Sequence, residues 1–88
     1  MNILVTFEPR GALYVQFRDA TVIRTVELIE DELLIDLDEG GNVLGIEALR
    51  PGILSVSLGQ IAEAYRLPEE VHFINFDKVD RAYAVANA

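Results

Sequence analysis

The stretch 33–49, LLIDLDEGGNVLGIEAL, decides the fold of this chain. Two runs of alternating apolar residues meet there at Gly40-Gly41, and this dipeptide suits a two-residue hairpin turn of type I′ or II′. Side chains alternate between the two faces of a strand, so this pairing gives one dry face and one acidic face. A shift of the pairing by one residue would mix apolar and acidic side chains on each face. The predicted cross-strand pairs are Leu37 with Leu44, Ile35 with Ile46, Leu33 with Ala48, Asp38 with Val43, Asp36 with Gly45 and Leu34 with Glu47.

Three further strands are predicted before this hairpin, at residues 2–7, 12–18 and 22–29. Pro9 and Gly11 suit a type II turn between the first two strands, because proline presets the first turn dihedral and glycine accepts the positive one. The run 12–18 has the most distinct apolar and polar faces of the predicted strands. Its apolar face carries Leu13, Val15 and Phe17, and its other face carries a candidate interaction surface of Tyr14, Gln16 and Arg18.

The strand at 22–29 has two possible phases. Val26 and Leu28 face the core in one phase, with Arg24 at the end of the same face. In the other phase the core face is formed by Ile23, Thr25, Glu27 and Ile29, and the sequence fits this phase nearly as well. The pattern alone therefore leaves the register of this strand open.

Pro51-Gly52 ends the β-rich part, and helical spacing replaces alternation after Ser57. Ser57 and Gln60 form a capping-box pattern, and they predict a helix at 57–66 that Pro68 ends. Its apolar positions are Leu58, Ile61, Ala62 and Tyr65.

A second helix is predicted at 77–86, with Asp77 as its N-cap. Its apolar side is formed by Val79, Ala82, Tyr83 and Ala86. The conformation of 67–76 stays open, and one interpretation is a short extended segment through Val71, Phe73, Ile74 and Phe76.

The predicted architecture is therefore a single α+β domain over residues 1–88. Residues 1–50 form its β-rich part, an antiparallel sheet of four to five strands that includes 33–38 and 43–49, and residues 51–88 form its helical part. The order of the strands stays open.

Composition narrows the possible functions. Fifteen acidic and seven basic side chains give a net charge of −8, which disfavours binding to nucleic acid. Cysteine is absent, which excludes disulfides and thiolate chemistry. No apolar run is long enough for a signal peptide core or a membrane span, so we expect a cytoplasmic protein without membrane contact.

Three carboxylates near the turn, Asp36, Asp38 and Glu47, are the candidate metal ligands. Their spacing partly matches a twelve-residue calcium loop, but Gly40 offers no side-chain oxygen at the fifth position, and both flanks alternate as strands rather than helices. The pattern favours an acidic hairpin, and a weaker divalent-ion site remains the alternative.

No set of residues indicates catalysis. His72 is the only histidine, and Ser55 and Ser57 stand in no nucleophile-elbow motif. Glycine-rich phosphate-binding motifs are also missing. We therefore expect a protein that is not an enzyme and binds no cofactor.

Two segments resemble a known family. They run from Phe7-Glu8-Pro9 to Phe17 and from Thr25 to Glu47, and they contain the strings ALYV and DLDEGGNVLGIE. These strings are similar to the ALYI-like strand and the DLDxxGxxxGIE hairpin of the small prokaryotic domain-of-unknown-function family 2283. The chain departs from the family pattern at Gly11, where an acidic residue is usual, and at Gly40, where aspartate is common. The resemblance implies an antiparallel sheet packed against helices, and it implies no reaction.

These observations predict a small acidic protein that is a protein-interaction or regulatory module and acts by contact with a protein partner, either a basic protein or a second copy of itself. The alternative is a weak divalent-ion or small-molecule site on the acidic face of the hairpin.

Overall fold

The structure is a computed structural model that describes residues 3–8, 11–50, 52–69, 71 and 74–86. Five strands in this part of the chain form one antiparallel sheet in the order β1-β2-β5-β4-β3, and two helices follow it, so the predicted α+β class is confirmed. The elements are β1 Leu4–Phe7, β2 Leu13–Gln16, β3 Arg24–Ile29, β4 Leu33–Leu37, β5 Val43–Ala48, α1 Ile53–Ala64 and α2 Phe76–Ala86. The predicted turn at Pro9-Arg10 lies outside the described residues.

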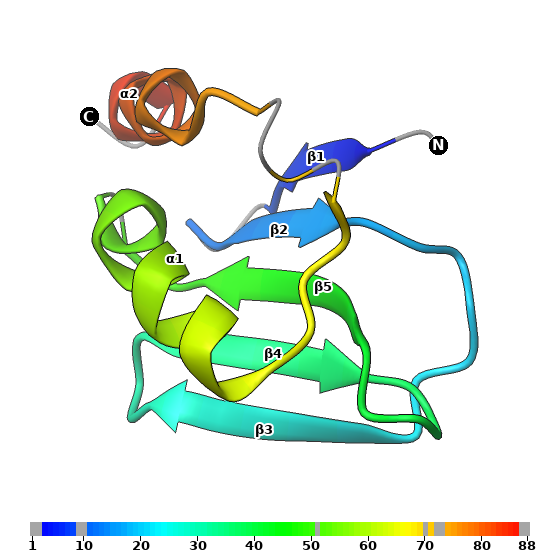
Figure 1. Cartoon of the computed structure of the whole chain (residues 1–88). Helices are drawn as coiled ribbons and strands as arrows, with labels where there is room; N and C mark the ends of the chain where they lie inside the picture. The colour runs from blue at the N-terminus through cyan, green and yellow to red at the C-terminus, as the bar shows by residue number, and fades with distance from the viewer. Residues whose placement is uncertain (1–2, 9–10, 51, 70, 72–73, 87–88) are drawn as a thin grey trace.

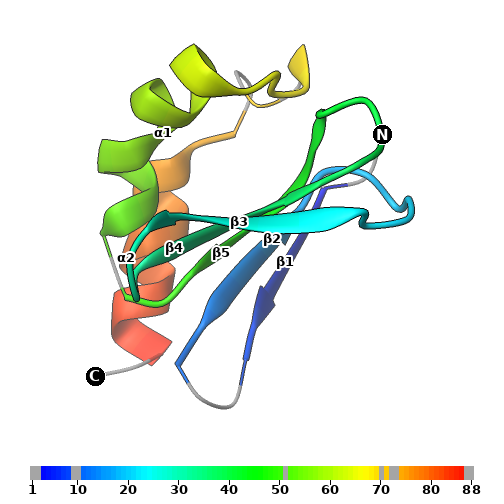
Figure 2. The same ribbon diagram turned by 90° about the horizontal axis from the view of Figure 1, so that it is seen from below.

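Both helices cover the same face of the sheet (Figures 1 and 2). The alternating apolar residues of the central strands point to that face, and burial against the helices removes them from water. The prediction for β2 is confirmed, because Leu13, Val15 and Phe17 are fully buried while Tyr14 and Gln16 are half-buried. Other core residues are Leu33, Ile35, Leu37, Val43, Ile46, Ile53, Leu54, Ile61 and Tyr83.

The central hairpin forms largely as predicted. Ile35 pairs with Ile46, and the pairs Leu33–Ala48, Leu34–Glu47 and Asp36–Gly45 also form. The predicted pairs Leu37–Leu44 and Asp38–Val43 are wrong, because Leu37 pairs with Val43 and Leu44 is an extra residue in a bulge.

Asp38 explains this shift. Its Oδ1 accepts hydrogen bonds from the backbone N–H groups of Gly40 at 2.9 Å and Asn42 at 2.8 Å, while its own N–H donates to the Asn42 carbonyl at 3.1 Å. These bonds close a loop longer than two residues, since an aspartate side chain can organise the backbone two or more positions ahead. Gly41 takes the left-handed conformation that this loop requires, with φ 80°.

A second bulge resolves the register of β3. Val26 pairs with Ile35 and Arg24 with Leu37, which is the first of the two predicted phases. The register then shifts between Glu27 and Ile29, so that Ile29 pairs with Leu33. An extra residue in a strand reverses the facing of those that follow, which is why both phases fitted the sequence.

Helix α1 begins four residues before the predicted start at 57. Its N-cap is Gly52, with φ 86° and no side-chain capping bond, so the predicted capping role of Ser57 is wrong. Ser57 is instead buried within the helix. Ile53 and Leu54 are buried in the core, and their packing extends the helix toward its N-terminus without a polar cap. Ala62, predicted on the apolar side, is exposed.

Helix α2 begins at Phe76, and its N-cap is Asn75 rather than the predicted Asp77. The Asn75 side-chain oxygen accepts a hydrogen bond from the Lys78 N–H at 3.1 Å, as an N-cap does. Val79 and Tyr83 pack against the core as predicted, but Ala82 is exposed.

In its described residues, the connector between the helices turns and is not extended. The Val71 N–H donates to the Pro68 carbonyl at 3.1 Å, and the Ile74 N–H donates to the Val71 carbonyl at 3.2 Å. Such bonds, three residues apart, are typical of turns. Phe73 lies outside the described residues, and Phe76 belongs to α2. In the described part of the chain, neither helix has the length and apolar character needed to cross a membrane.

Candidate functional site

The face of the sheet that the helices leave uncovered carries a polar cluster. We call this face the outer face, and the cluster consists of Glu8, Tyr14, Thr25, Asp36 and Glu47. The Tyr14 hydroxyl donates a hydrogen bond of 2.7 Å to Asp36 Oδ2, and the Thr25 hydroxyl donates one of 2.5 Å to Asp36 Oδ1. Residues from β2, β3 and β4 are thereby tied together across the outer face.

Gly45 makes the contact between Tyr14 and Asp36 possible. It lies on β5, between the strands that carry the two partners, and it pairs with Asp36. A Cβ atom at this position would lie 2.1 Å from the Tyr14 hydroxyl oxygen and 2.5 Å from the ring carbon that bears it. Glycine therefore provides the space in which the tyrosine side chain crosses β5.

We expect Gly45→Ala and Tyr14→Phe each to lower the free energy of unfolding by about 1–2 kcal/mol, because each removes a hydrogen bond to a carboxylate. The double variant should lose less free energy of unfolding than the two single variants lose together, since both changes disrupt one contact. Urea unfolding of the four proteins measures this coupling.

Gly59→Ala is the matched control for Gly45→Ala. Nothing lies within 4 Å of a Cβ added at Gly59, which is in α1. Alanine should therefore stabilise the helix by about 0.5–1 kcal/mol. Strictly additive costs for Gly45→Ala and Tyr14→Phe would contradict the proposed contact.

Burial and neighbouring acids alter the ionisation of this cluster. The pKa of Tyr14 is raised, first by burial and then by the hydrogen bond that its hydroxyl donates to Asp36. The pKa of Glu47 is also raised, first by burial and then by the carboxyl of Glu8 within hydrogen-bonding reach. The negative charge of Asp36 adds to the second shift. Protonation of Glu47 removes its repulsion with these neighbouring acids.

The raised pKa of Glu47 predicts a pH dependence of stability. The folded state holds the Glu47 proton more tightly than the unfolded chain does, so the stabilisation is present at low pH and is lost as pH rises through the raised pKa. Glu47→Gln cannot titrate. Its stability relative to the natural chain should therefore increase between a pH of about 4 and neutrality.

Thermal unfolding across this pH range measures the effect. Glu63→Gln on α1 removes the same charge at an exposed site outside the cluster. The same pH trend in both variants would show a general effect of net charge and would contradict the role of the Glu8–Glu47 contact.

The predicted interaction surface on β2 is only partly continuous. Tyr14 belongs to the polar cluster, and Gln16 lies beside it on the same strand. Arg18 lies beyond the end of β2, where it is exposed and lines a pocket at the hairpin turn.

The three predicted metal ligands do not share one set of neighbours. The electrostatic neighbours of Glu47 include Glu8 and Asp36. The Asp38 carboxylate instead accepts bonds from its own loop, and the pKa of Asp38 is lowered by the Asn42 backbone N–H and next by the Asn42 side chain. Among the described residues, no group of three or more carboxylate or histidine side chains is arranged to hold a metal ion. His72 lies outside those residues.

The sequence did not point to Glu8 and Thr25 as members of the cluster. Thr25 is recognisable only once β3 is placed beside β4, and Glu8 only once β1 is placed beside β2. The alternating pattern carried a partial signal, because it assigned Thr25 to a face opposite that of Val26.

The fold and the cluster define a small α+β domain whose antiparallel sheet has one helix-covered face and one polar, uncovered face. A family model described as a protein of unknown function (DUF2283) matches residues 11–50 of the chain, in agreement with the resemblance found in the sequence. The matched segment spans β2 to β5 and includes Tyr14, Asp36, Gly45 and Glu47. No curated protein and no solved structure matched the chain in the same comparisons.

Proposed function

We propose that this protein is a cytoplasmic, non-enzymatic interaction module that binds a basic segment of a partner protein on the outer face of its sheet. The observation that carries the proposal is the cluster of Tyr14, Asp36 and Glu47 on a face that neither helix covers. The proposal assigns binding to the residues that lie within the matched segment of the family.

The chemistry of the outer face supports a cationic partner. An aromatic ring beside carboxylates offers apolar contact area together with charge, a combination that suits an arginine or lysine side chain. The net charge of −8 would also speed the approach of a basic protein. A cation next to Glu47 stabilises its charged form against the burial and the neighbouring acids that raise its pKa, so binding should release protons and tighten as pH rises.

Affinity purification from the source cells with three tagged forms of the chain tests this proposal. The natural chain and Glu63→Lys should recover the same basic partner, whereas Glu47→Lys should lose it. Both variants change the net charge by the same amount, but only Glu47 lies on the outer face. Thermal unfolding checks that both variants are folded. Equal recovery by the two variants, or no specific partner for the natural chain, would contradict the proposal.

Self-association is a second candidate, and the edge strand β1 favours it. Leu4, Val5 and Phe7 are 57%, 40% and 45% exposed, although all three are large and apolar. One side of β1 pairs with β2 and the other is a sheet edge. An unpaired edge can pair with the same strand of a second copy across a two-fold axis.

Sedimentation equilibrium of the natural chain and Leu4→Lys measures this mode. The natural chain should dimerise with increasing concentration. The variant should stay monomeric, because each copy would bring a lysine to the paired β1 strands and the two like charges would repel. A strictly monomeric natural chain would exclude the β1 dimer. That outcome would leave binding to the outer face as the proposed mode.

A further inference from the structure

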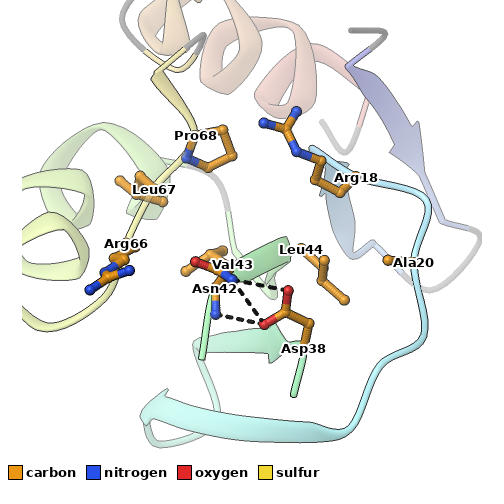
Figure 3. Close-up of a pocket in the computed structure, with 9 residues that line it drawn as sticks. All are labelled: Arg18, Ala20, Asp38, Asn42, Val43, Leu44, Arg66, Leu67 and Pro68. Carbon is orange, nitrogen blue, oxygen red and sulfur yellow. Dashed lines mark hydrogen bonds between the residues drawn. The ribbon is translucent and has the colours of Figure 1, made fainter. Parts of the chain in front are cut away.

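A pocket of about 440 Å³ lies where the hairpin turn meets the connector between the helices. Its lining comes from three segments far apart in the sequence: the loop after β2, the turn between β4 and β5 with the start of β5, and the connector after α1 (Figure 3). None of these lining residues belongs to the polar cluster of the outer face. The pocket is lined by Arg18, Ala20, Asp38, Asn42, Val43, Leu44, Arg66, Leu67 and Pro68.

The backbone holds the three walls together. Leu44, the extra residue of the β5 bulge, accepts hydrogen bonds through its carbonyl from the N–H groups of Phe17 at 2.7 Å and Arg18 at 3.2 Å. On the other side, the Val43 N–H donates to the Arg66 carbonyl at 3.2 Å, within a bridge between Asn42 and Arg66. The bulge and the bridge thus fix the backbone at both arginines relative to the same turn.

Positive charge is concentrated at this pocket. Two of the seven basic side chains of the chain, Arg18 and Arg66, line it from opposite sides (Figure 3). Its single carboxylate, Asp38, already accepts hydrogen bonds from Gly40 and Asn42 within the turn. The lining therefore contains two guanidinium groups and one carboxylate that is already hydrogen-bonded, in a chain that is otherwise strongly acidic.

The rest of the lining is mostly apolar. Val43 and Leu44 are buried, and Leu67, Pro68 and Ala20 add further apolar surface. Ligand pockets commonly combine an apolar wall with a few polar groups that set orientation, in volumes of about 300–1,000 Å³. Guanidinium groups bind carboxylate and phosphate oxygens through paired hydrogen bonds.

We propose that this pocket binds a small organic anion, one that carries a carboxylate or phosphate group on an apolar body. Arg18 and Arg66 contact the anionic group or hold it by charge, and the wall of Val43, Leu44 and Leu67 contacts the apolar body. The site is separate from the outer face, and it does not depend on the function proposed for that face.

Titration of the isotope-labelled full chain, followed by nuclear magnetic resonance, tests the proposal. The probes are phenylacetate for a carboxylate, phenyl phosphate for a phosphate ester, and inorganic phosphate for charge without an apolar body. Saturable changes of the amide chemical shifts of Val43, Leu44 and Leu67 are expected with one or both aromatic probes. The probe that binds more tightly identifies the preferred anionic group.

Single arginine variants provide the specific readout. Arg18→Gln and Arg66→Gln should each weaken binding about tenfold, which corresponds to the loss of about one charge-assisted hydrogen bond. Arg50→Gln is the matched control, because Arg50 follows the other end of β5 and pairs with Glu32 at 2.8 Å. The amide spectrum of each variant shows whether its fold is intact.

Three outcomes would overturn the proposal. The first is the absence of saturable shifts around the pocket at millimolar concentrations of both aromatic probes. The second is equal weakening by Arg50→Gln, which would show an effect of net charge alone. The third is equal affinity for inorganic phosphate, which would exclude a contribution from the apolar wall.

Discussion

Replacing Ile35 by alanine is expected to lower the free energy of unfolding by about 2–5 kcal/mol. Ile35 is fully buried on β4 and pairs with Val26 on one side and Ile46 on the other. Removing its side chain leaves a cavity in the middle of the sheet, where the paired backbones of the neighbouring strands limit collapse. A domain of 88 residues has a total stability of about 5–10 kcal/mol, so the loss is a large share. Urea unfolding followed by circular dichroism measures it.

Leu34→Ala is the internal control for this experiment. Leu34 is the neighbouring residue on the same strand, but it points to the outer face and is only half-buried. Its replacement should cost about 1 kcal/mol or less, because little apolar surface is removed from the core. Equal costs at the two positions would contradict the assignment of the faces of β4.

Replacing Tyr83 by alanine should cost about 3–5 kcal/mol, the range for a buried aromatic side chain. Tyr83 is fully buried on α2, and its ring stacks on that of Phe7 with the ring centres 6.0 Å apart. This contact joins the last helix to the first strand. Thermal unfolding measures the loss, and limited proteolysis should show easier cleavage within α2.

Val85→Ala separates packing from helix propensity. Val85 lies on the same helix, but 78% of its surface is exposed. The change should alter the free energy of unfolding by about 0.5 kcal/mol or less. An unchanged stability of Tyr83→Ala would show that α2 contributes no packing to the sheet.

The two proposed binding regions have opposite electrostatic character. The outer face presents Asp36 and Glu47, whereas the pocket at the turn presents Arg18 and Arg66. The central hairpin contributes to both, through its strands to the first and through its turn to the second. Binding at one region can therefore be tested while the other is left intact.

Local pattern was sufficient for most of the fold. Alternation of apolar residues identified every strand of the described sheet, because a face buried under helices requires apolar side chains at every second position. The same pattern predicted the pairing of Ile35 with Ile46, which lies far enough from the turn to be unaffected by its geometry. The pattern mispaired Leu44 and left the register of β3 open, since a bulge shifts the register without any local signal in the alternation.

Capping residues were a weaker guide to the helices. Ser57 matched a capping box, yet burial of Ile53 and Leu54 extended α1 past it. Tertiary packing overrides local propensity when the additional turn buries apolar surface. The sequence also identified Tyr14 as part of an interaction surface and Asp36 and Glu47 as candidate metal ligands, but it did not connect the tyrosine with the two acids.

The sequence by itself determined the α+β class, the strands, and the central hairpin with one dry and one acidic face, because each of these depends on the spacing of neighbouring residues. Only the tertiary structure decided which distant residues meet. The strand order placed Tyr14 over Gly45 and against Asp36, and the connector after α1 brought Arg66 to the turn that Arg18 also reaches. Such contacts depend on how strands and helices pack in three dimensions, and the spacing of residues along the chain does not encode that arrangement.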